Sequence, residues 1–160
     1  MRRSWKALAC GAIALGTIGL GIGVASAHNP TPTGRQGCTP GFWKNNVVAW
    51  ESTAPNVYSP DETLGSVFTG VSPSLANKTL LEALNFQGNL GPEARLLRAA
   101  VAALLNTVHF DVAYPLGTEG ELIAQVNAAL ASGGSALETL KNTLDSWNNL
   151  GCPLSANVDY

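Results

Sequence analysis

Residues 92–111, PEARLLRAAVAALLNTVHFD, form the stretch that decides the fold. Pro92 favours the first position of a helix. Apolar side chains then recur at helical spacing, at Leu97, Val101, Leu104, Leu105 and Val108. No formally charged residue lies between Arg98 and Asp111. The pattern predicts a central, mostly buried helix against which the rest of the domain packs.

Two amphipathic helices are predicted after this central helix. Thr118 and Glu121 have the spacing of a capping box, and Ser135 and Glu138 have the same spacing further on. The apolar positions that follow are Leu122, Val126 and Leu130 in the first helix, and Leu137, Leu140, Leu144 and Trp147 in the second. Glycines at 133–134 and at Gly151 are expected to end the two helices.

Two shorter helices are predicted before the central one. Residues 42–51 place Trp43, Val47 and Trp50 at helical spacing, and residues 75–86 place Leu80, Leu81 and Leu84 inward. Residues 52–74 are predicted to be irregular because they contain three prolines, although residues 59–62 have the form of a helix start. No convincing alternation of period two appears. The sequence therefore predicts an all-α fold, a compact bundle of four to five short helices closed by one disulfide.

The first 27 residues, MRRSWKALACGAIALGTIGLGIGVASA, have the organisation of a bacterial signal peptide. Basic residues at the start are followed by an uncharged stretch that ends in the small-x-small pattern of residues 25–27. A retained membrane anchor is the alternative, because about 20 apolar residues can span a bilayer. Five glycines weaken such a helix, so we expect cleavage after Ala27 and a secreted or cell-surface location.

Cleavage would change the charge balance of the chain. Residues 1–27 hold Arg2, Arg3 and Lys6, three of the nine basic residues, and none of the eleven acidic ones, so the remainder carries a net charge of −5. Nucleic-acid binding normally needs a basic face. The sequence therefore argues against a nucleic-acid partner. The C-terminal tail has no hydrophobic anchor, and we expect no membrane attachment after cleavage.

Two cysteines remain after residue 27, Cys38 and Cys152. In an exported chain such a pair is expected to form a disulfide. Free or metal-bound thiols are the alternative, but two thiols alone do not make a structural zinc site. We therefore expect a flexible lead-in over residues 28–37, a helical domain over residues 38–152 closed by the disulfide, and a tail over residues 153–160.

Residues 38–46, CTPGFWKNN, resemble the CTPGYWKNH module of bacterial secreted and surface proteins. The resemblance extends through LLEALN (80–85), AAVAALLN (99–106) and LGCPL (150–154). It implies an extracellular location and no settled activity. The chain departs from the module at Asn46, where the module has His, and at Val47, where Pro is common. Any chemistry that depends on that His would be lost here.

Aromatic and amide side chains gather early in the predicted domain, at Phe42, Trp43, Asn45, Asn46 and Trp50. If exposed, they would form a binding surface for a glycan or a surface protein, because aromatic rings stack on sugars and anchor interfaces. If buried, they form the part of the core beside the disulfide. Exposure of Trp43 and Trp50 distinguishes the two hypotheses.

The two histidines are the candidates for catalysis or metal binding. His109 lies two residues from Asp111, which suggests either a general-base pair or a helix-end histidine. His28 would become the N-terminal residue after cleavage, and with His109 it could supply nitrogen ligands for copper. We assign no catalytic residues and expect no cofactor.

Arg95 and Arg98 lie in the first turns of the central helix. They are expected to pair with Glu93 or other acids, or to meet an anionic partner. Taken together, the sequence predicts a non-catalytic module that acts as a binding or structural component of the cell exterior. The alternative is a small extracellular enzyme or metal-binding protein that uses His109 and Asp111, or His28.

Overall fold

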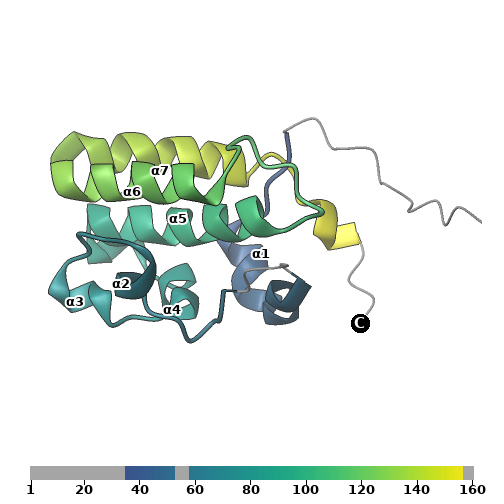
Figure 1. The fold of residues 1–160 in the computed structure, drawn as a ribbon, viewed down its shortest axis with the longest axis horizontal. Coiled ribbons are helices and arrows are strands. Elements are labelled where there is room, and N and C mark those ends of the chain that lie inside the picture. The colour runs from purple at the N-terminus through teal and green to yellow at the C-terminus, as the bar shows by residue number, and fades with distance from the viewer. Residues whose placement is uncertain (1–34, 53–57, 157–160) are drawn as a thin grey trace, which may run out of the picture.

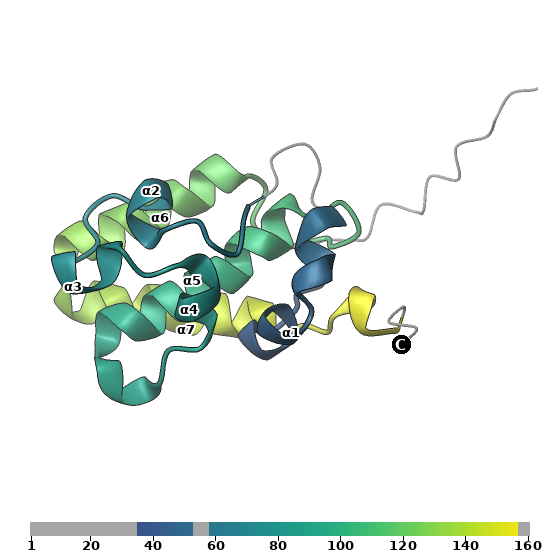
Figure 2. The ribbon, with the colours of Figure 1, turned by 90° about the horizontal axis from the view of Figure 1, so that it is seen from below.

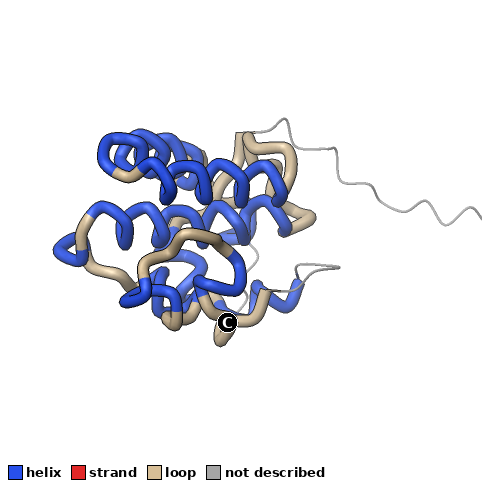
Figure 3. The backbone as a smooth tube through the Cα atoms, turned by 60° about the vertical axis from the view of Figure 1, so that its left-hand side comes forward, coloured by secondary structure: helices blue, strands red, loops and turns tan. Residues whose placement is uncertain are grey.

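The computed structural model describes residues 35–52 and 58–156. The predicted signal peptide, most of the lead-in with His28, and the last four residues lie outside these ranges. Regular structure in the described ranges is helical, with no strand (Figure 3). The α-helices are α1 (Pro40–Asn45), α2 (Leu64–Val67), α3 (Pro73–Ala76), α4 (Leu80–Leu84), α5 (Pro92–Val108), α6 (Glu119–Ser132) and α7 (Gly134–Asn148). Three 3-10 helices accompany them, η1 (Val47–Ser52), η2 (Gly88–Leu90) and η3 (Pro153–Ala156).

The helices form three layers, with α5 in the middle (Figure 1). Helices α6 and α7 lie along one side of α5, and α1 to α4 lie along the other. Every residue from Ala99 to Asn106 is buried, so α5 is covered all round over two turns. The absence of charge in this stretch makes that burial possible, because an unpaired buried charge is costly. The predicted all-α fold and its central helix are confirmed.

The two long helices after α5 begin differently from each other. Thr118 caps α6 as predicted, since its side-chain oxygen accepts a hydrogen bond from the Glu121 amide at 3.2 Å. The predicted cap at Ser135 is wrong. Gly133, with φ of +64°, ends α6 and also precedes the first residue of α7, so the chain reverses within one residue. A non-glycine residue rarely adopts that backbone conformation.

The predicted helix over residues 75–86 is wrong, because it is divided into α3 and α4. Thr79 and Glu82 form a complete capping box that starts α4 anew. The residues on either side of Thr79 pair with residues 62–64, since Leu64 N–H donates to Lys78 O and Leu80 N–H donates to Glu62 O, both at 2.8 Å. These long-range bonds compete with the helical hydrogen bonds that a continuous helix would need.

The stretch predicted as irregular, residues 52–74, contains α2 and the start of α3. The helix start expected at residues 59–62 is only a turn, in which Glu62 N–H donates to Ser59 O at 3.0 Å. Helix α2 begins two residues later, where Leu64 is fully buried. The first residue of α2 is therefore the one whose side chain enters the core and whose N–H pairs with Lys78 O.

The ordered domain begins before Cys38 and continues past Cys152. Gln36 N–H donates to Ala113 O at 3.0 Å, and Gly37 N–H donates to Gly151 O at 3.1 Å. Gly37 lies so close to α7 that an added Cβ would collide with its backbone. After Cys152, Leu154 of η3 packs against the core. Residues 36–37 and 153–156 therefore belong to the folded unit, not to the lead-in or the tail.

Candidate functional site

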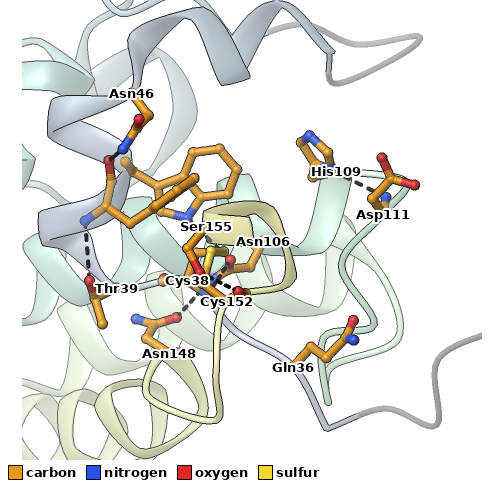
Figure 4. The surroundings of a disulfide bond; sticks show 12 residues. Gln36, Cys38, Thr39, Asn46, Asn106, His109, Asp111, Asn148, Cys152 and Ser155 are labelled. Carbon is orange, nitrogen blue, oxygen red and sulfur yellow. Dashed lines mark hydrogen bonds between the residues drawn. A yellow bond between two sulfur atoms is a disulfide. The ribbon is translucent and has the colours of Figure 1, made fainter. Parts of the chain in front are cut away.

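The predicted Cys38–Cys152 disulfide is present in the structure (Figure 4). It joins the residue that precedes the α1 cap to the segment that follows α7, with a Cα–Cα distance of 4.3 Å. The bond therefore connects the two ends of the described chain across 114 positions of sequence. A disulfide is compatible with an extracellular location.

A buried amide lies beside the disulfide. The Asn106 side-chain oxygen accepts hydrogen bonds from Cys38 N–H at 2.8 Å and from the Trp43 indole N–H at 3.1 Å. Its amide nitrogen donates to Cys38 O at 2.9 Å and to the Asn148 side-chain oxygen at 3.0 Å. Asn106 therefore makes four hydrogen bonds and holds both backbone groups of Cys38 in place.

Asn148 extends this network to the other layer of the fold. Its side-chain oxygen also accepts from the Tyr114 hydroxyl at 2.8 Å, and its nitrogen donates to Ala99 O at 3.0 Å. Burial raises the pKa of Tyr114, so its hydroxyl stays protonated as a donor. Sequence reasoning missed this network. The available signal was Asn106 itself, a polar residue inside an otherwise apolar helical run.

Trp43 and Trp50 are fully buried, with 0% exposure each. The Trp43 indole bonds to Asn106, and the Trp50 indole N–H donates to Trp43 O at 3.1 Å. Neither ring reaches the surface, so neither can stack on a sugar. The interpretation of both tryptophans as an exposed glycan site is wrong, and the interpretation as core is correct.

The other members of the predicted surface are divided in their roles. Asn46 caps α1, since its side-chain nitrogen donates to Phe42 O at 2.8 Å. Phe42 is half-buried and meets the Trp43 ring edge to face at 5.3 Å. Asn45 is exposed, and Val48 nearby on η1 is also exposed. These residues lie close in sequence to the buried tryptophans, and Asn45 and Val48 are the exposed ones among them.

His109 lies at the end of α5, and its side chain is only 4% exposed. Its ring stacks on Phe110 at 5.1 Å and lies 5.9 Å from the Trp43 ring. Its Nδ1 accepts a hydrogen bond from the backbone N–H of Asp111 at 3.2 Å, as Figure 4 shows. The bond involves the Asp111 backbone and not its carboxylate, so it is a hydrogen bond within a turn.

Burial lowers the pKa of His109, and the nearby Asp111 charge opposes this only in part. The folded protein therefore takes up the proton at lower pH than the unfolded chain, whose histidine titrates near pH 6.5. Stability contributed by neutral His109 is complete above that value and is lost as the pH falls toward the folded pKa. Protonation would also remove the Nδ1 acceptor.

We expect the urea midpoint of the wild type to decrease as the pH is lowered from about 7.5 to about 5.5. His109→Gln should reduce the slope of the midpoint against pH. His28→Gln changes the only other histidine and should leave the slope unchanged. Glu82 and Glu138 have lowered pKa values, so their titration lies below this range. Equal slopes in the wild type and His109→Gln would contradict the attribution of this pH dependence to His109.

The described ranges hold no group of three His, Cys, Asp or Glu side chains that could bind a metal ion. His28, the other proposed copper ligand, lies outside those ranges. In the same part of the chain, every helix is too short or too polar to cross a bilayer.

Comparison with protein-family models, curated proteins and solved structures found no match.

Proposed function

We propose that the protein is an exported, non-catalytic helical module that acts as a binding or structural component of the cell exterior. The observation that carries the proposal is the Cys38–Cys152 disulfide, which joins the two ends of the folded unit. Such bonds persist in oxidising compartments and are rare where glutathione keeps thiols reduced. The signal-peptide pattern of residues 1–27 supports the same location.

The buried polar side chains support a structural rather than a catalytic interior. Asn106, Asn148 and His109 are the buried polar residues of the described core, and each is hydrogen-bonded within the fold. A side chain that is buried and hydrogen-bonded within the fold stabilises the core. The enzyme alternative based on His109 and Asp111 is therefore disfavoured, and a surface protein or a glycan outside the cell is the proposed partner.

Export can be tested with the full chain expressed in a bacterial host. We expect the culture medium or envelope fraction to contain a form that begins at residue 28 and whose mass is two hydrogens below that of its reduced form. Ala27→Phe places a bulky residue at the cleavage position and should leave the uncleaved precursor in the membrane fraction. An uncleaved chain that stays in the cytoplasm with all three cysteine thiols titratable, Cys10 included, would contradict the proposal.

Binding can be tested by sedimenting the exported protein with isolated cell envelopes. A non-catalytic module should bind equally well as wild type and as His109→Gln, because His109 is largely buried, with 4% exposure. Binding that is lost only in the His109→Gln variant would favour the enzyme or metal alternative. The fold of that variant is checked by circular dichroism.

A further inference from the structure

The connection from α4 to α5 runs past the first turns of α5 (Figure 2). A pocket of about 180 Å³ is lined by residues of this connection, of the first turns of α5 and of the middle of α7. Its lining residues are Phe86, Gly88, Arg95, Arg98, Lys141 and Asp145. Half of the six basic residues after residue 27 therefore line this one pocket, together with a single acid. The concentration is unexpected in a segment whose net charge is −5.

Arg98 supplies the positive charge that is not neutralised. Its Nε–H donates to Leu84 O at 3.2 Å, which fixes the guanidinium group against the end of α4. The ion pairs among the described residues do not include Arg98. A guanidinium group has five N–H donors in a rigid plane, and this bond uses one of them. The terminal nitrogens therefore remain to bind a ligand.

Arg95 and Lys141 are held in place by their own partners. Arg95 donates to Gly88 O at 3.1 Å and forms an ion pair with Glu138 on α7. Lys141 pairs with Asp145 at 2.9 Å, one turn along the same helix. These pairs cancel much of the charge of Arg95 and Lys141. Both side chains therefore have protein partners, and Arg98 is the lining residue whose charge is left for a ligand.

We propose that this pocket binds a single oxyanion group, the phosphate or carboxylate of a small ligand, with Arg98 as the principal contact. The fork of an arginine matches two oxygens of either group. The pocket volume of about 180 Å³ is enough for one such group. Phe86 lines the pocket and would lie beside the group that carries the anion. This inference goes beyond the proposed function and does not depend on export.

The test is a titration of the purified exported protein followed by ¹H–¹⁵N NMR. Inorganic phosphate is compared with chloride at equal ionic strength, so that general screening is matched. We expect saturable shifts at Gly88 and at the Arg98 Nε–H with phosphate only, and a dissociation constant in the millimolar range. Shifts that are the same in phosphate and chloride would overturn the proposal.

Two arginine variants with the same change in charge separate the pocket from general attraction. Arg98→Gln is expected to weaken phosphate binding about tenfold, the loss of one charge-assisted contact. Arg35→Gln removes an exposed arginine from the opposite end of α5, beside the contact of Gln36 with Ala113, and should leave the affinity unchanged. Equal effects of the two variants would overturn the proposal.

Asp145→Asn is expected to change the phosphate affinity in the opposite direction from Arg98→Gln. A misfolded variant would not bind phosphate more tightly. The substitution removes the acid from the lining and releases Lys141 from its ion pair, so phosphate should bind more tightly. Unchanged or weaker phosphate binding would contradict the proposal that this pocket binds the anion.

Titrations with glycerol phosphate and with glucuronate identify the chemical class of the anion. Binding of the phosphate ester alone assigns a phosphorylated ligand, and binding of glucuronate as well assigns carboxylates to the same site.

Discussion

Replacing both half-cystines by alanine, Cys38→Ala with Cys152→Ala, is expected to lower the free energy of unfolding by about 2–5 kcal/mol. The bond closes a loop of 114 positions, so its loss releases a large entropy in the unfolded chain. In the folded state, the segment before α1 would then be held by hydrogen bonds and by the burial of Trp43. Urea denaturation of the exported protein measures the difference.

The mechanism of this effect makes a second measurement possible. The unfolded chain without the bond is more expanded, so the dependence of the unfolding free energy on urea should become steeper. Reduction of the disulfide should lower the unfolding free energy of the wild type to that of the double variant. It should leave the unfolding free energy of the double variant unchanged. A loss below about 1 kcal/mol, together with two accessible thiols in the untreated wild type, would falsify the role of the bond.

Asn106→Ala is expected to cost about 3–5 kcal/mol, because it leaves several buried polar groups without partners. The groups affected are the N–H and C=O of Cys38 and the indole N–H of Trp43. Leaving a buried donor unsatisfied costs more than the net gain from forming its bond in the first place. The urea dependence should stay close to that of the wild type, since the change acts on the folded state.

Asn45→Ala is the matched control for this experiment. It makes the same chemical change at an exposed position of α1, and it should alter stability by no more than about 0.5 kcal/mol. The indole proton of Trp43 supplies an independent readout, because its NMR shift should move in Asn106→Ala and not in Asn45→Ala. Similar losses of stability in the two variants would show that the amide network does not stabilise the core.

The elements that could be predicted from sequence are those whose signal is local and strong. Helix α5 follows from a run of apolar residues without charge, and the start of α6 follows from a Thr–Glu capping pattern. The same capping pattern failed at Ser135, because α7 begins two residues earlier than that cap would place it, with Gly133 at the cap and Gly134 as its first residue, both with positive φ. The division of residues 75–86 was also missed, since pairing with residues 62–64 is not visible locally.

The candidate sites divide in the same way. Trp43 and Trp50 could be identified as important aromatics, but whether they faced solvent depended on where α1 packs against α5. The pocket brings residues of α5 and α7 together, and the ion pair of its lining residue Arg95 with Glu138 spans 43 positions. No pattern of neighbours along the chain contains that distance, so only the packed structure could assemble the pocket.

The sequence by itself determined that the chain is helical, that α5 is its centre and that Cys38 pairs with Cys152. Apolar periodicity and the number of cysteines are properties of the linear order, so they need no knowledge of packing. The tertiary structure alone decided that Asn106 joins the disulfide region to α7 and that Arg98 keeps an unneutralised charge in a pocket. Both depend on which side chains meet across the interior, and those distances are set only when the layers pack.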